Sequence, residues 1–172
     1  MEQVLIQKRS VILGKMLGVA GFAGALGVAA MVKVPLFFTP VHLTLQNLVV
    51  FLAGAMLGPV AGMAAVLLYV MVGSCVGTLA FFGPTGGYLL GFVAAAGLIG
   101  SFRGVIKSRS LLLPFLVMLT GVAAIYVCGG AWLSLGYGWT VKQAFTLGVL
   151  PFIGGDVMKA LVAATICRKG RI

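Results

Sequence analysis

Long uncharged, apolar stretches dominate this chain and predict membrane-spanning helices. Between Lys33 and Arg103 lie 69 residues without Asp, Glu, Lys or Arg, and a second uncharged run of 32 residues extends from Ser110 to Val141. A membrane-spanning helix needs only about 20 predominantly apolar residues. No sustained apolar/polar alternation occurs over segments of about ten residues, which disfavours the strands of a membrane barrel. The pattern therefore predicts an all-α, polytopic membrane protein.

Proline and glycine divide the apolar runs into six expected spans. Pro35 and Pro40 interrupt the start of the longest run, because proline disfavours helix at and before its own position. Gly58-Pro59 and the glycine-rich segment 83–87 break the same run again. The expected spans lie near residues 11–32, 43–58, 60–75, 86–103, 111–134 and 143–168, within a single integral membrane domain over residues 1–172.

The positions of Lys and Arg provide an independent prediction of topology, because cytoplasmic loops carry an excess of these residues. Six spans place both termini on the same side of the membrane. If the termini are inside, Lys33 and Lys142 fall outside and Lys159 falls within a span. The remaining basic residues then gather on the cytoplasmic side: Lys8, Arg9, Lys15, Arg103, Lys107, Arg109, Arg168, Lys169 and Arg171. We therefore expect six spans with both termini cytoplasmic.

A cleavable signal peptide is an alternative interpretation of the first apolar run. Lys8 and Arg9 precede the run, and Val28-Ala29-Ala30 lies near its end. Cleavage would leave five spans, a mature N-terminus outside and a weaker asymmetry of basic residues. A retained first span agrees better with the charge distribution.

Composition narrows the class of protein further. Only 8% of the residues are charged, against roughly 25% in soluble globular domains, so an ordinary soluble fold is excluded. The formal net charge of +10 raises nucleic acid as a partner, which would require a continuous basic face. Long apolar runs separate the basic residues instead. We therefore expect no nucleic-acid binding and attribute the charge mainly to membrane orientation.

One acid and one base stand within the apolar segments. Asp156 and Lys159 are three residues apart, so on a helix they share a face and can neutralise each other. Ionisable residues inside a membrane span are costly and mark functional sites by default. Pro151 favours a helix that starts nearby, with Asp156 in the first turn, where an acid suits the helix dipole. A pair that only fixes helix register is the structural alternative.

The expected position of Asp156 is nearer the outer face of the membrane. It precedes Arg168 by 12 residues, or roughly 18 Å along a helix, in a hydrocarbon core about 30 Å thick. The outer connections carry polar and aromatic residues that could surround it: Phe37, Phe38, Thr39, His42, Thr44, Gln46, Asn47, Thr78, Phe81, Phe82, Thr85, Tyr88, Tyr137 and Trp139. A few polar groups among many apolar ones are typical of a small-ligand pocket.

The sequence offers no catalytic or metal-binding constellation. His42 is the single histidine, and Cys75, Cys128 and Cys167 lack paired metal spacing. Gly14-Lys15 lacks the upstream glycine and the following hydroxyl of a phosphate-binding loop. We therefore expect no enzyme activity, no metal and no cofactor, and no hydrolysis of ATP through such a loop.

Small residues recur at four-residue spacing in the first span, and such faces let helices approach closely in lipid. Internal packing of the bundle is the simpler use of these residues. Docking of another membrane subunit is the alternative. The residues concerned are Gly14, Gly18, Ala20, Gly21, Gly24, Ala25 and Ala29.

Several motifs, in matching order over nearly the whole chain, resemble those of the BioY family, the biotin-binding S components of energy-coupling-factor (ECF) vitamin transporters. The most specific are GPTGGYLLGF at 83–92 and the later Gly155-Asp156-x-x-Lys159. Shorter pieces accompany them: Thr44-Leu45-Gln46, Leu52-Ala53-Gly54-Ala55 and Leu57-Gly58-Pro59.

The resemblance implies a six-helix bundle in the cytoplasmic membrane of a prokaryote that captures biotin from the outer side. It implies that Asp156 and Lys159 contact the ureido end of biotin, and that Gln46, Thr85 and Tyr88 line the pocket. Family members carry a ligand-contacting Asn in the loop before the motif at 83–92; residues 75–82 have none, and we expect Thr78 to bind the ligand in its place. It also implies association with a transmembrane coupling subunit and two ATPases, through the small-residue face of the first helix. A binding subunit for another small vitamin, or a membrane assembly subunit without a ligand, are the alternatives.

Overall fold

Helices make up most of the chain. The computed structural model describes residues 2–77, 83–108 and 110–170 of the 172. The helices are, in chain order, α1 (Glu2–Met31), α2 (Gln46–Leu57), α3 (Pro59–Cys75), α4 (Gly86–Ser101), α5 (Arg103–Ile106), α6 (Leu112–Tyr137), α7 (Val141–Gly148), the 3-10 helix η1 (Leu150–Phe152) and α8 (Ile153–Gly170). Thr78 lies outside the described residues.

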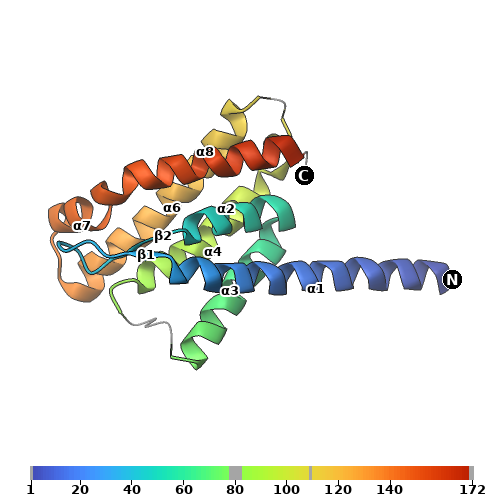
Figure 1. The fold of residues 1–172 in the computed structure, drawn as a ribbon, viewed down its shortest axis with the longest axis horizontal. Helices are drawn as coiled ribbons and strands as arrows, with labels where there is room; N and C mark the ends of the chain where they lie inside the picture. The colour runs from blue at the N-terminus through green and yellow to red at the C-terminus, as the bar shows by residue number, and fades with distance from the viewer. Residues whose placement is uncertain (1, 78–82, 109, 171–172) are drawn as a thin grey trace.

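The longer helices pack side by side into one bundle (Figure 1). The start of α1 and the end of α8 lie at one end of this bundle, and α7 lies at the other. A short antiparallel ribbon, β1 (Lys33–Val34) with β2 (Leu43–Thr44), lies at the same end as α7. Pro35 and Pro40 keep this connection out of helix, as predicted. The predicted span 43–58 begins too early, because Leu43 and Thr44 belong to β2 and α2 begins at Gln46.

Three helical stretches in the described residues are long and apolar enough to cross a membrane: Arg9–Met31, Leu112–Tyr137 and Val141–Gly170. Three shorter apolar helices, α2, α3 and α4, accompany them. Each of the six segments that the sequence predicted as a span thus falls on an apolar helical stretch. The first helix begins at Glu2, earlier than the predicted span, because residues 2–10 contain neither glycine nor proline to interrupt it.

Pro151 interrupts the last predicted span, as expected from its missing N–H. Helix α7 ends at Gly148, η1 contains Pro151, and α8 begins at Ile153. Residues 143–168 are therefore two helices rather than one. The break places Asp156 in the first turn of α8, where the helix dipole favours a carboxylate.

Glycines allow the central helices to approach closely. A Cβ atom added at Gly54 of α2 would lie 2.6 Å from the backbone oxygen of Ala96 in α4, and one at Gly91 of α4 would lie 2.7 Å from Cα of Ile125 in α6. Real Cβ atoms essentially never approach other atoms so closely. Small residues at helix interfaces are the usual means of tight packing in lipid. Helix α4 is therefore held closely between α2 and α6.

This packing predicts that Gly54→Ala destabilises the folded protein by about 1–3 kcal/mol, the usual range for overpacking. The added methyl group would meet the backbone of α4, which cannot move aside as a flexible side chain can. Gly130→Ala is the matched control, because a Cβ there meets nothing within 4 Å. Thermal unfolding in detergent measures both variants. A midpoint for Gly54→Ala at or above that of Gly130→Ala would contradict the close α2–α4 contact.

Candidate functional site

A cavity of about 870 Å³ lies inside the bundle, towards the ribbon end. Residues from α1, the β1–β2 connection, α2, α3, α4, α6, η1 and α8 line it. Its walls are mainly apolar, with Leu89 and Phe92 from α4 and Ile125 from α6 among them. A largely apolar cavity of this size is typical of a small-molecule binding site.

The buried polar side chains of the molecule gather at this cavity. In the described part of the chain, the buried polar or charged residues are Gln46, Asn47, Asp156 and Lys159, and all four line the cavity. Burial of a polar group is unfavourable unless it forms a hydrogen bond within the protein or with a ligand. Their concentration in one place identifies the cavity as the candidate site.

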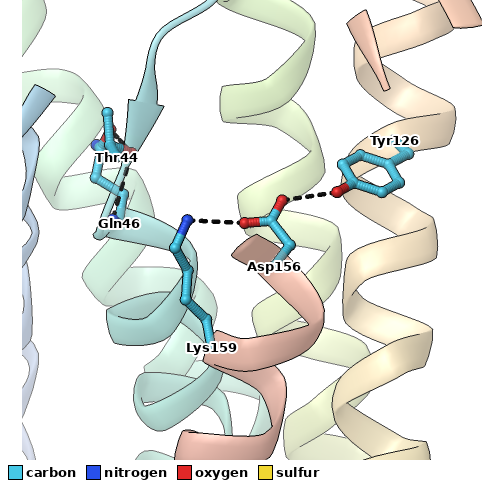
Figure 2. A network of polar contacts seen from close by, with 5 residues as sticks. All are labelled: Thr44, Gln46, Tyr126, Asp156 and Lys159. Carbon is cyan, nitrogen blue, oxygen red and sulfur yellow. Dashed lines mark hydrogen bonds and ion pairs between the residues drawn. The ribbon is translucent and has the colours of Figure 1, made fainter. Parts of the chain in front are cut away.

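An ion pair occupies the cavity wall formed by α8. Lys159 Nζ lies 2.8 Å from Asp156 Oδ1, and the Asp156 and Lys159 residues are only 2% and 9% exposed. From α6, the Tyr126 hydroxyl donates a hydrogen bond of 2.9 Å to the other oxygen, Asp156 Oδ2. Figure 2 shows Tyr126 on one side of the carboxylate and the ammonium on the other. Both groups are thus fixed in position by neighbours.

This arrangement leaves hydrogen-bonding capacity for a ligand. A carboxylate offers about four acceptor sites and an ammonium three donor hydrogens. The contacts of Asp156 with Tyr126 and Lys159 use one site on each carboxylate oxygen, and the ion pair uses one donor hydrogen of Lys159. The pair can therefore present an acceptor and a donor side by side to a neutral polar group.

A second polar cluster lies at the start of α2. Gln46 Nε2 donates to the Tyr69 hydroxyl of α3 over 2.7 Å, and the Thr44 hydroxyl donates to Gln46 Oε1 over 3.1 Å. Figure 2 shows Gln46 on the side of Lys159 away from Tyr126. The amide of Gln46 is therefore held in one orientation beside the ion pair.

Five of the six residues predicted to bind ligand line this one cavity: Gln46, Thr85, Tyr88, Asp156 and Lys159. The hydroxyl of Tyr88 donates to the backbone oxygen of Gly148 over 2.7 Å. Tyr88 thus joins α4 to the end of α7 through its hydroxyl. The sixth residue, Thr78, lies outside the described residues.

Two basic side chains line the exposed part of the cavity. Lys33 in β1 and His42, just before β2, are both exposed and both belong to the lining. Lys33 pairs with Thr44 in the ribbon, so the ribbon brings Lys33 to the start of α2. Since Asp156 already neutralises Lys159, the lining carries an excess of positive charge near its opening.

Comparison with known proteins matches this chain to the model of the BioY family over residues 6–171. The chain belongs to the BioY family. It is 37% identical over 160 residues to the probable biotin transporter BioY of Pyrococcus horikoshii, which covers 88% of this chain and 92% of the relative. It is 34% identical over 154 residues to the biotin transporter BioY of Thermotoga maritima, covering 84% and 88%.

A solved structure has the same fold as this BioY-family chain. It is the crystal structure of the S-component for biotin from an ECF-type ABC transporter, with a TM-score of 0.84 and 25% sequence identity. The match covers 94% of this chain and 93% of the other. The resemblance noted from the sequence motifs is thereby confirmed.

Three of the five BioY motifs, distant in the sequence, meet around the cavity. Thr44-Leu45-Gln46 connects β2 to α2, the run at 83–92 contains the start of α4, and Gly155-Asp156 lies in the first turn of α8. All three contribute lining residues. Each motif therefore places a helix start and its polar residues at the same site.

Tyr126 and Tyr69 are site residues that the sequence did not predict. Both stand within uncharged apolar runs, with no motif beside them. Their hydroxyls bond Asp156 and Gln46, respectively. Their position in apolar runs could have indicated a role, because a tyrosine hydroxyl inside a membrane helix requires a polar partner.

The small residues of α1 do not form one uniform face. A Cβ at Gly18 would meet Leu57, whereas one at Gly14, Gly21 or Gly24 would meet nothing within 4 Å. Ala20 and Gly24 line the cavity, Ala25 is exposed and Ala29 is buried. These residues thus divide between internal packing, the cavity and an open surface that includes Gly14 and Gly21.

The buried ion pair predicts a non-additive effect on stability. Lys159→Met leaves the Asp156 carboxylate without its cation, and breaking a buried pair costs about 3–5 kcal/mol. The double variant Asp156→Leu/Lys159→Met removes both charges and is expected to be more stable than Lys159→Met alone. Lys142→Met, at an exposed position on α7, is the control. Thermal unfolding in detergent measures all three; equal midpoints for Lys159→Met and wild type would contradict the expected stabilisation.

Proposed function

We propose that this chain is the biotin-binding subunit of an ECF-type transporter. The observation that carries the proposal is the Asp156–Lys159 pair, buried beside Gln46 in an otherwise apolar cavity. The relatives named biotin transporters and the solved S-component for biotin support the same ligand.

The polar pair suits the ureido end of biotin. A ureido group has N–H donors on either side of a carbonyl acceptor. The Asp156 carboxylate can accept from an N–H, while the Lys159 ammonium donates to the carbonyl oxygen. The Gln46 amide, oriented by Thr44 and Tyr69, lies on the adjoining wall. Both ends of the ion pair thus have a role in binding a neutral ligand group.

The rest of the cavity suits the remainder of biotin. The thioether ring and the aliphatic chain are apolar and match lining residues such as Leu89 and Phe92. Thr85 and Tyr88 line the wall at the start of α4. The ligand carboxylate would lie nearer the opening, where Lys33 and His42 contribute positive charge or N–H donors.

We place the chain in the cytoplasmic membrane of a prokaryote, with six spans and both termini inside. Helix α1 begins and helix α8 finishes at the same end of the bundle, and the cavity lies towards the opposite end. Most basic residues near helix ends belong to the first of these ends in the predicted topology. With that end inside, the opening beside Lys33 and His42 faces outward.

The chain itself would supply binding rather than catalysis. Transport would require a transmembrane coupling subunit and two ATPases, with ATP used only by those partners. The solved neighbour is a component of an ECF-type ABC transporter. The open surface of α1 around Gly14 and Gly21 supplies the close helix approach that a coupling subunit needs.

Calorimetry on the purified protein tests the ligand. We expect biotin to bind, and Asp156→Asn and Lys159→Ala each to weaken binding about 10- to 150-fold, the range for losing a charged hydrogen bond. Lys142→Ala is the control on the exposed surface of α7. If another small vitamin binds and biotin does not, the chain is the binding subunit for that vitamin instead. Co-purification with partners without any ligand binding would favour an assembly subunit.

The basic opening predicts a preference for the ligand carboxylate. In wild type, biotin is expected to bind more tightly than biotinamide, whose tail is uncharged. Lys33→Gln/His42→Gln should reduce this difference by about two- to fivefold, the scale of an exposed ionic contact. Lys142→Gln, at the same end but outside the lining, should leave the difference unchanged. An undiminished preference in the double variant would place the carboxylate elsewhere.

A further inference from the structure

A second cavity lies further along α1, towards the end of the bundle where α1 begins and α8 ends. Its volume is about 940 Å³, and α1, the α2–α3 junction, α3, the end of α4 and α5 enclose it. Most of its lining is apolar and much of that is small, with Met16 from α1 and Ala61 and Ala64 from α3. Two cations, Lys15 of α1 and Arg103 of α5, complete the wall. We call this cavity the basic groove.

Acidic side chains that could neutralise the basic groove are scarce. The chain contains two Asp and Glu residues, Glu2 and Asp156. Asp156 is bound to Lys159 at the other cavity. Glu2 precedes Lys15 by 13 residues on the continuous helix α1, about 20 Å along the axis, which is remote from the groove. Among the described residues, neither Lys15 nor Arg103 forms an ion pair with an acid, so both are placed to bind an anion from outside the chain.

We propose that the basic groove binds an anionic phospholipid. The phosphate of the headgroup would lie between Lys15 and Arg103, and an acyl chain would lie along the small residues of α3 and the apolar side chains of α1. A soluble anion would not require the apolar wall, and a zwitterionic lipid would not require two cations. Basic pockets between membrane helices on the cytoplasmic side are known to bind anionic headgroups.

The position of the groove in the bundle agrees with a lipid ligand. In the proposed topology its cations lie at the cytoplasmic end, and the cytoplasmic leaflet carries the anionic lipids. Helix α1 is also weakly packed against the bundle. Only 6% of its most apolar 18-residue segment is buried, against 39% for the corresponding segment of α6. A lipid in the groove would contact α1, α3 and α5 together and so hold α1 against the bundle. This proposal does not depend on the ligand of the first cavity.

Native mass spectrometry of the detergent-purified full chain tests the proposal, with phosphatidylglycerol and phosphatidylcholine as the lipid probes. Wild type is expected to retain phosphatidylglycerol in preference to phosphatidylcholine. Lys15→Gln and Arg103→Gln should each weaken phosphatidylglycerol binding about fivefold, and the double variant about thirtyfold, from roughly 1 kcal/mol per basic residue near the surface. Ala64→Leu, which fills the groove without changing its charge, should weaken binding as well.

Lys107→Gln is the matched control, because Lys107 is exposed four residues beyond Arg103 and does not line the groove. An equal loss of phosphatidylglycerol in Lys107→Gln would overturn the proposal, since only general surface charge would then attract the lipid. Equal retention of both lipids by wild type would overturn it too. Full competition by free glycerol 3-phosphate would show a site for a soluble anion instead. Size-exclusion elution verifies folding, and the single variants carry the test if the double variant does not fold.

Discussion

A carboxylate and an ammonium buried among apolar helices have little water to solvate them, so the protein must supply their partners. Asp156 and Lys159 neutralise each other, and Tyr126 bonds the free oxygen of the carboxylate from α6. This requirement joins α8 to α6 through Tyr126, and the break at Pro151 places Asp156 in the first turn of α8, where it can make these contacts. It also orients the pair towards Gln46 and the cavity (Figure 2). Structure and binding site thus depend on one interaction.

Because Asp156 and Lys159 neutralise each other, the charge at each end of the molecule is set by the other basic residues there. With Lys159 paired to Asp156, the remaining lysine of the cavity lining is Lys33, which makes the exposed part of the lining positive. At the other end, Lys15 and Arg103 lie along an apolar groove and form no ion pair with an acid among the described residues. The two cavities thus differ in chemistry, because the first contains a buried polar pair and the second joins two cations to an apolar wall.

The uncharged apolar runs and their glycine and proline breaks predicted the helices well, because an apolar run bounded in this way has few alternatives to a helix in lipid. The breaks at Gly58-Pro59 and Pro151 are where the sequence placed them. The β1–β2 ribbon was missed, since two residues per strand leave no detectable alternation. In the site, Asp156 and Lys159 stood out by charge. Tyr126 and Tyr69 did not, because their partners come from other helices and a tyrosine in an apolar run resembles a packing residue.

The two cavities follow one another along α1, and Ala20 of α1 together with Leu68 of α3 lines both of them. The small side chain of Ala20 therefore lies where the two cavities adjoin. Since α1 is also the least buried of the three long apolar stretches, its position is determined by fewer internal contacts than that of α6. A displacement of α1 would change the width of both cavities at once. The small residues along α1 consequently serve three surfaces: the ligand cavity, the basic groove and the open face that includes Gly14 and Gly21.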